Sequence, residues 1–137
     1  MGSGCWYTCN SVTKPQVARV STVPTLNEGL LLTSEVEGFR LRKSGDATDL
    51  FMRLQRAARV VRTWGDGYGY LMVATGRAEV MIDPIMNLWD AAPLLPIIEE
   101  AGGHFSDWKG NATIRAGEAL ATNGRLSREV LGMIGEK

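Results

Sequence analysis

The chain has 137 residues, of which 45% are hydrophobic and 22% are charged, and 15 basic side chains balance 15 acidic ones. This length suits a single domain with a sizeable core. The balanced charge favours neither a nucleic-acid partner nor a membrane surface. No apolar run approaches the ~20 residues that cross a bilayer. Residues 1–10 lack a signal-peptide pattern, and Cys5, Cys9 and the single His104 make a poor disulfide framework or zinc site. A cytoplasmic, reduced protein is therefore expected.

The hydrophobic pattern predicts strands and helices in alternation. Short apolar runs bounded by turn formers predict strands at residues 29–36, 60–63, 78–83, 104–108 and 120–122, with further candidates at 4–12 and 17–20. Apolar spacings of three and four, with capping residues, predict helices after Ser44-Gly45-Asp46, at 68–75, after Asp90 and at 127–134. Elements interleaved in this way indicate an α/β fold with a layered mixed sheet flanked by helices.

The run from Asn87 to Gly103 places one carboxylate, Asp90, at the start of an apolar helix that ends on paired glycines. Asp is a strong helix N-cap, and a carboxylate at the positive end of a helix with apolar walls suits a metal ion or a phosphate. An ordinary cap on a buried helix is the alternative. Pro93 would fall in the first turn, where it costs little, whereas Pro96 should kink the helix.

Two more acidic residues follow or end predicted strands. Asp66 lies between glycines in a turn that allows close approach of the backbone to a ligand; its alternative role is to cap the next helix. Asp83 ends the strand at 78–83, on the side of an open α/β sheet where ligands bind; its alternative role is to start an Asp-Pro turn. Asp66, Asp83 and Asp90 could thus line one cleft. No Ser-His-Asp arrangement, P-loop or Rossmann fingerprint occurs.

The segment Trp89-Asp90-x-Ala92, running on to Glu100-Ala101-Gly102-Gly103, resembles the C-terminal signature of the inositol monophosphatase family, which comprises magnesium-dependent, lithium-sensitive phosphatases. The likeness extends from about Val60 to the end of the chain. The segments 62–70, Asp83-Pro84 and Asp107-Trp108 look like the histidinol-phosphatase branch.

The resemblance implies particular site residues. Asp90 matches a metal-ligand aspartate that also orients the attacking water, so it would be the catalytic residue of this chain. Trp64, Gly65 and Asp66 match the substrate-binding turn, and Asp83 matches an acid that contacts the leaving-group moiety. Asp66 suits the ammonium group of histidinol phosphate, whereas Trp64 replaces a small residue and would narrow the site or stack on an imidazole. The implied cofactor is Mg²⁺.

The implied reaction is hydrolysis of a phosphate monoester, histidinol phosphate, in histidine biosynthesis. Family members are longer and carry, before the matched region, a Gly-Glu metal motif and an Asp-Pro-x-Asp-Gly-Thr motif; neither precedes it here. Residues 1–137 therefore resemble the C-terminal part of the family fold, without its N-terminal metal-binding part. Because one carboxylate holds Mg²⁺ poorly, the chain is expected to be inactive alone.

The chain is also expected to need a partner, either the missing N-terminal half or a second copy. Without it, an apolar face around Leu30–Leu32 and the helix at 68–75 would be uncovered. Two alternatives to histidinol phosphate hydrolysis stay open. One is hydrolysis of inositol phosphate or another sugar or nucleotide phosphate, and the other is a non-catalytic binding or dimerisation module.

Overall fold

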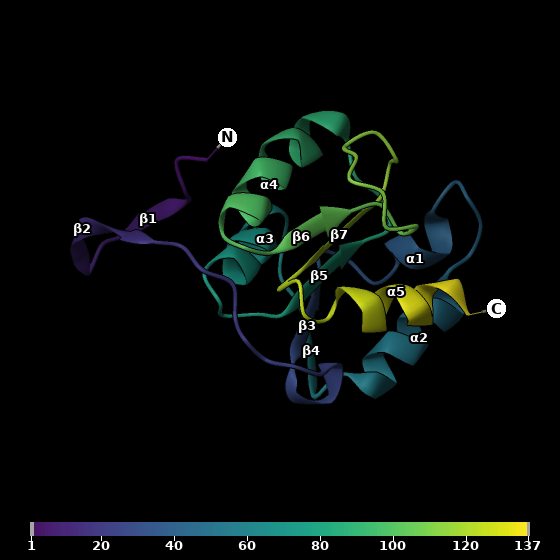
Figure 1. Ribbon diagram of the computed structural model, residues 1–137. Helices are drawn as coiled ribbons and strands as arrows, with labels where there is room; N and C mark the ends of the chain where they lie inside the picture. Colours follow the sequence, from purple (N-terminus) through teal and green to yellow (C-terminus); the bar gives the residue numbers. More distant parts are fainter. Residues whose placement is uncertain (1, 137) are drawn as a thin grey trace.

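The computed structural model describes residues 2–136, which form a five-stranded sheet between helices and a separate two-stranded hairpin (Figure 1). The helices are α1 (Gly38–Leu41), α2 (Thr48–Ala57), α3 (Gly67–Ala74), α4 (Leu88–Glu100) and α5 (Ser127–Gly135), with a 3-10 turn at Leu26–Glu28. The strands are β1 (Trp6–Cys9), β2 (Val12–Val17), β3 (Leu30–Thr33), β4 (Val60–Thr63), β5 (Val80–Asp83), β6 (His104–Ser106) and β7 (Ala119–Thr122).

The main sheet has the strand order β4-β3-β5-β7-β6. Strand β3 runs parallel to β4 and β5, whereas β7 is antiparallel to β5 and β6. This confirms the predicted mixed sheet. Because the three parallel strands end at the same edge, the residues that follow Thr33, Thr63 and Ile82 are brought together there.

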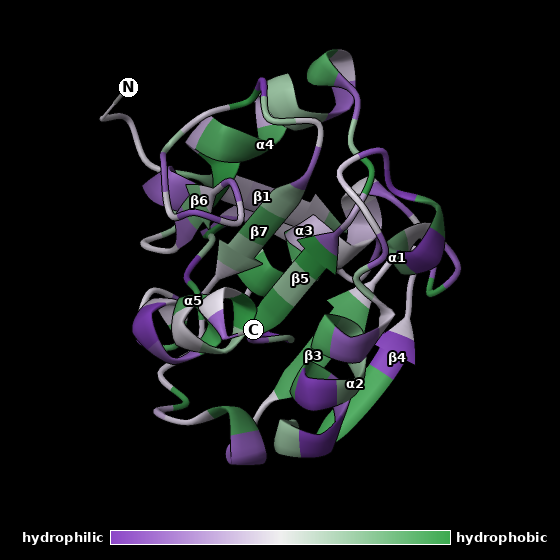
Figure 2. Cartoon of the chain, turned by 90° about the vertical axis from the view of Figure 1, so that its right-hand side faces the viewer, coloured by the Kyte–Doolittle hydropathy of each residue, from purple (hydrophilic) through white to green (hydrophobic). Residues whose placement is uncertain are grey.

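Both faces of the sheet are covered by helices. Side chains alternate along β3, so Leu32 packs with Tyr70 and Ile98 on the face covered by α3 and α4, while Leu31 packs with Phe51 on the face covered by α2 and α5. Figure 2 shows the hydrophobic strands β3, β5 and β7 at the centre of the molecule.

The expectation of an uncovered apolar face at Leu30–Leu32 is wrong. Leu31 and Leu32 are 0% and 1% exposed, because the sheet lies between two helical layers within this chain. The part of the expectation that concerns the helix at 68–75 agrees with the structure, because Tyr68 and Leu71 of α3 are exposed. Among residues 2–136, no helix is long and apolar enough to cross a membrane.

Two predicted strands have different bounds in the structure. The candidate at 17–20 is wrong, since β2 stops at Val17, and the chain then leaves the hairpin with a bond from the Ala18 amide to the Cys5 carbonyl (2.7 Å). Strand β6 stops at Ser106 because the Asp107 carboxylate accepts bonds from the amides of Lys109 and Asn111, which turns the chain. The remaining predicted strands and helices are present with small shifts at their ends.

Helix α4 begins three residues earlier than expected, so the predicted cap at Asp90 is wrong. Asn87 precedes the helix with extended backbone (φ −80°, ψ 153°), and its carbonyl accepts bonds from the amides of Asp90 and Ala91. Asp90 instead lies in the first turn, where a carboxylate still benefits from the positive helix end. Both prolines lie inside the helix, with Pro93 deeper than predicted.

The other end of α4 stops at the paired glycines, as predicted. Gly102 has a φ of +90°, and its amide donates to the Glu99 carbonyl, while the Gly103 amide donates to the Ile98 carbonyl. These two bonds are those of a Schellman motif, which needs a left-handed residue at the position of Gly102. The motif fixes where α4 ends and β6 begins.

Candidate active site

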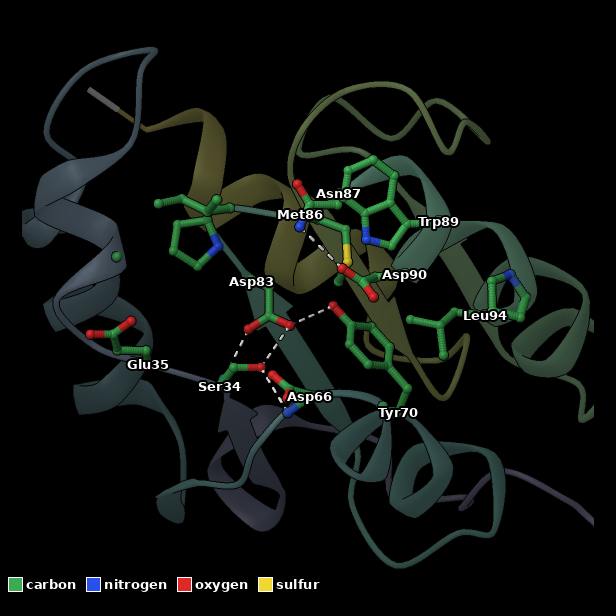
Figure 3. A pocket seen from close by; sticks show the side chains of 15 residues that line it. Ser34, Glu35, Asp66, Tyr70, Asp83, Met86, Asn87, Trp89, Asp90 and Leu94 are labelled. Atoms are coloured by element: carbon green, nitrogen blue, oxygen red, sulfur yellow. Dashed lines mark hydrogen bonds between the residues drawn. The ribbon is translucent and has the colours of Figure 1, made fainter.

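A cavity of about 520 Å³ opens at the edge of the sheet where β3 and β5 end (Figure 3). Three pairs of neighbouring residues bring polar groups to it: Ser34 and Glu35 follow β3, Asp66 and Gly67 begin α3, and Trp89 and Asp90 lie in the first turn of α4. Asp83, the last residue of β5, lies between them.

The cavity is acidic. Glu35, Asp66, Asp83 and Asp90 line it, and no Lys, Arg or His is found among its lining in the described part of the chain. Negative charges gathered in one concave site repel an anion and attract a cation. An anionic ligand such as a phosphate ester would therefore need a cation beside it to enter.

Asp83 is the most buried of these carboxylates, at 3% exposure. Its Oδ1 accepts bonds from the Ser34 amide (2.8 Å) and the Thr33 hydroxyl (3.4 Å), and its Oδ2 accepts bonds from the hydroxyls of Ser34 (3.0 Å) and Tyr70 (2.9 Å). Burial raises the pKa of Asp83, and the four hydrogen bonds oppose that rise without cancelling it.

Tyr70 is fully buried on α3 and points toward β5. Burial, and then the neighbouring charge of Asp83, raise the pKa of Tyr70 well above its ordinary value. The phenol therefore keeps its proton at neutral pH and donates a hydrogen bond to Asp83.

Asp66 directly precedes α3, in a conformation that non-glycine residues rarely adopt, with φ 51° and ψ −139°. Its amide donates to the Ser34 hydroxyl (3.2 Å), and its own carboxylate, which is exposed, makes no capping bond to the helix. The alternative that the Asp66 side chain caps the next helix is therefore wrong. The carboxylate is presented at the cavity instead.

Asp90 is exposed at the opposite rim and accepts a bond from the Asn87 side-chain amide (3.2 Å; Figure 3). The structure thus brings Asp66, Asp83 and Asp90 to one cavity, although Trp64 and Gly65 do not line it. Trp64 is half exposed and stacks on Tyr68, with ring centroids 5.5 Å apart.

Sequence reasoning missed Ser34 and Tyr70, which connect the acidic residues. Ser34 directly follows the apolar residues of a predicted strand, and Tyr70 lies one helical turn after Asp66. The sequence could therefore have placed Ser34 at the end of a strand and Tyr70 on a helix beside Asp66. What the sequence lacked was a sign that β3 and β5 are neighbours.

The cavity does not by itself form a complete metal site. Within residues 2–136, no group of three or more His, Cys, Asp or Glu side chains is arranged to hold a metal ion. Asp66 and Asp90 are exposed carboxylates of the kind that bind hard cations. They are too few to replace the several waters that such an ion carries.

The model of the inositol monophosphatase family matches residues 1–135 of this chain. The chain belongs to the inositol monophosphatase family. It is 34% identical to a histidinol-phosphatase of Streptomyces coelicolor over 131 residues, which are 96% of this chain and 48% of that protein. It is 46% identical to a histidinol-phosphatase of Chlorobaculum parvum over 84 residues, which are 61% of this chain and 32% of that protein. The chain thus spans less than half the length of these relatives.

Solved structures of the inositol monophosphatase family have the same fold. SuhB of Mycobacterium tuberculosis aligns with a TM-score of 0.78 and 25% identity over 97% of this chain and 51% of that one. An inositol monophosphatase of Zymomonas mobilis aligns with a TM-score of 0.79 and 26% identity over 88% of this chain and 47% of that one. The family and the fold predicted from the sequence are both confirmed.

Proposed function

We propose that this chain forms the substrate-facing part of a Mg²⁺-dependent phosphomonoesterase that hydrolyses histidinol phosphate. The observation that carries the proposal is the convergence of Asp66, Asp83 and Asp90 on one cavity, in a chain whose relatives include histidinol-phosphatases. The relatives are about twice as long. The rest of the site is accordingly proposed to come from outside these 137 residues.

Asp90 is the proposed metal ligand and catalytic residue of this chain. Its carboxylate is exposed in the first turn of α4, at the positive helix end, and faces an acidic cavity. We infer that it gives one oxygen to a divalent cation, whose other ligands come from the missing part. A solved structure of the same fold, an IMPase/NADP phosphatase, is a complex with NADP and Ca²⁺.

Asp66 is the proposed selector for an aminated substrate. Its carboxylate lies at the cavity rim, where no basic side chain neutralises it within the described lining. A charge-assisted bond from a substrate ammonium group to this carboxylate would contribute about 1.5–3 kcal/mol, or about 10- to 150-fold in relative turnover. A neutral sugar phosphate would gain nothing from it.

The proposal is tested in a chimera in which this chain replaces the matched part of the Streptomyces coelicolor relative. The chimera should release phosphate from histidinol phosphate in the presence of Mg²⁺, and this chain alone should not. Asp66→Ala should reduce the kcat/KM for histidinol phosphate about 10- to 150-fold more than that for inositol 1-phosphate. The matched control is Glu99→Gln, which changes an exposed acid of α4 outside the cavity.

Two outcomes would refute the proposal. One is a folded chimera that binds neither Mg²⁺ nor histidinol phosphate, which is the behaviour of a non-catalytic module. The other is a preference for inositol 1-phosphate that Asp66→Ala leaves unchanged, which would favour hydrolysis of a sugar phosphate.

A further inference from the structure

We propose that Asp83 is a positioning residue: through the Ser34 hydroxyl it holds the Asp66 turn in its left-handed conformation. The part of this inference that concerns the substrate rests on the proposed function. The part that concerns the turn rests on the geometry alone.

The first observation is that the Asp83 carboxylate is buried, at 3% exposure, and is bonded mainly to Ser34 and Tyr70. Its Oδ1 accepts a bond from the Ser34 amide, and its Oδ2 accepts bonds from the hydroxyls of Ser34 and Tyr70. The Thr33 hydroxyl has one proton, and its oxygen lies 3.4 Å from Asp83 Oδ1 and 3.5 Å from the Glu35 carbonyl oxygen. Ser34 and Tyr70 are therefore the residues that Asp83 holds most closely.

The second observation is that Ser34 bonds in two directions. Its hydroxyl has one proton, which it donates to Asp83 Oδ2 (3.0 Å), so a lone pair of the same oxygen is directed at the Asp66 amide (3.2 Å). The Ser34 amide also donates to Asp83 Oδ1 (2.8 Å). Two bonds donated to one carboxylate thus fix both the backbone and the hydroxyl of Ser34.

The third observation is that Asp66 needs such support. A non-glycine residue at φ 51° and ψ −139° carries a conformational cost and persists only where its surroundings hold it. The turn is also bonded by the Trp64 amide to the Thr33 carbonyl (3.0 Å) and by the Gly69 amide to the Asp66 carbonyl (3.2 Å). The Asp66 amide itself donates to the Ser34 hydroxyl.

Asp83 also reaches the same turn from its other side. Tyr70 donates to Asp83 Oδ2 from α3, the helix that directly follows Asp66. The buried carboxylate of β5 therefore fixes the end of β3 and the first turns of α3 together. The direction of the Asp66 carboxylate at the cavity rim follows from this arrangement.

The test uses nuclear magnetic resonance on this chain, so it needs no turnover. Ser34→Ala should increase hydrogen exchange of the Asp66 amide at least tenfold and change the coupling constant that reports its φ. Ser34→Thr, which keeps the hydroxyl, should restore both. Ser106→Ala is the matched control, because the Ser106 hydroxyl is buried without a hydrogen-bond partner. An Asp66 amide that Ser34→Ala leaves unchanged would overturn the proposal.

A second measurement separates positioning from direct contact. In the chimera, Ser34→Ala and Asp83→Asn should reduce the kcat/KM for histidinol phosphate by similar factors. The kcat/KM of the double variant should be no lower than that of the less active single variant, because both substitutions act through one turn. Loss of substrate binding in Asp83→Asn, with Asp66 exchange and the Ser34→Ala kinetics unchanged, would show that Asp83 contacts the substrate. A folded chimera that binds neither Mg²⁺ nor histidinol phosphate would refute the proposed function, and the exchange result on this chain would still test the turn.

Discussion

The substitution Gly103→Ala tests how closely α4 approaches the sheet, and α4 carries Asp90. A Cβ at this position would lie 2.6 Å from the Thr122 carbonyl oxygen, 2.9 Å from Ile98 Cγ2 and 3.0 Å from Val20 Cγ1. The nearest atom is backbone in β7, the strand that pairs with β6. The Thr122 carbonyl therefore cannot move without disturbing the sheet.

Overpacking of this kind costs about 1–3 kcal/mol, so we expect Gly103→Ala to lower the free energy of unfolding by that amount. The matched control is Gly132→Ala, within α5, where the added Cβ meets no atom within 4 Å. There the same change should raise the free energy of unfolding by about 0.5–1 kcal/mol, because alanine favours the helix.

The assay is urea unfolding of the two variants and the parent chain, followed by circular dichroism. Opposite shifts of the two midpoints are expected, with unchanged slopes. If Gly103→Ala were as stable as the parent while Gly132→Ala gained stability, the close contact between the end of α4 and β7 would be refuted.

Three further predictions concern the support of the fold and the site. Asp107→Ala should cost about 2–3 kcal/mol of unfolding free energy, since the buried carboxylate accepts bonds from the amide and the side chain of Asn111. Burial raises the pKa of Asp107, but its hydrogen bonds outweigh burial and leave the pKa below its ordinary value. The stability that the carboxylate contributes should therefore be lost as the pH falls through the folded-state pKa. Urea midpoints of the parent chain and of Asp107→Ala, measured between pH 7 and pH 3, check this. Arg42→Lys should cost about 1–2 kcal/mol in thermal unfolding, because lysine lacks the planar group that lies 4.1 Å over Trp108 and pairs with Glu118.

These predictions have controls of the same chemistry. Asp49→Ala removes an exposed carboxylate at the start of α2 and should change the urea midpoint little at any pH. Arg59→Lys changes an exposed arginine and should leave the melting temperature unchanged. Equal effects for Asp107→Ala and Asp49→Ala, or for Arg42→Lys and Arg59→Lys, would contradict the assigned contacts.

Much of the fold could be predicted because local signals were strong. The apolar run at β3, the spacing of Leu50, Phe51 and Leu54 on α2 and the paired glycines after α4 all led to the correct elements. The start of α4 was misplaced because Asp90 and Asn87 are both good caps by residue type. Only the backbone conformation of Asn87 distinguishes them.

The candidate site was predicted in part for the same reason. Asp66, Asp83 and Asp90 each stand beside a recognisable strand end or helix start, and the structure brings them to one cavity. The roles of Ser34 and Tyr70 depend on which strands are neighbours, and pairing between β3 and β5 is a long-range property that no local pattern encodes. Trp64 stacks on Tyr68, four residues later, and neither lines the cavity; the residue types alone did not distinguish this contact from a contact with the ligand.

The central claim is that Asp90 supplies an oxygen to Mg²⁺ in the completed site. It is tested most directly by the Mg²⁺ dependence of phosphate release in the chimera, compared between Asp90→Asn and the Glu99→Gln control on the same helix. We expect Asp90→Asn to raise the Mg²⁺ concentration for half-maximal activity at least tenfold and to lower the maximal rate, with no change in Glu99→Gln. The same Mg²⁺ dependence in Asp90→Asn, in Glu99→Gln and in the unsubstituted chimera would contradict the claim.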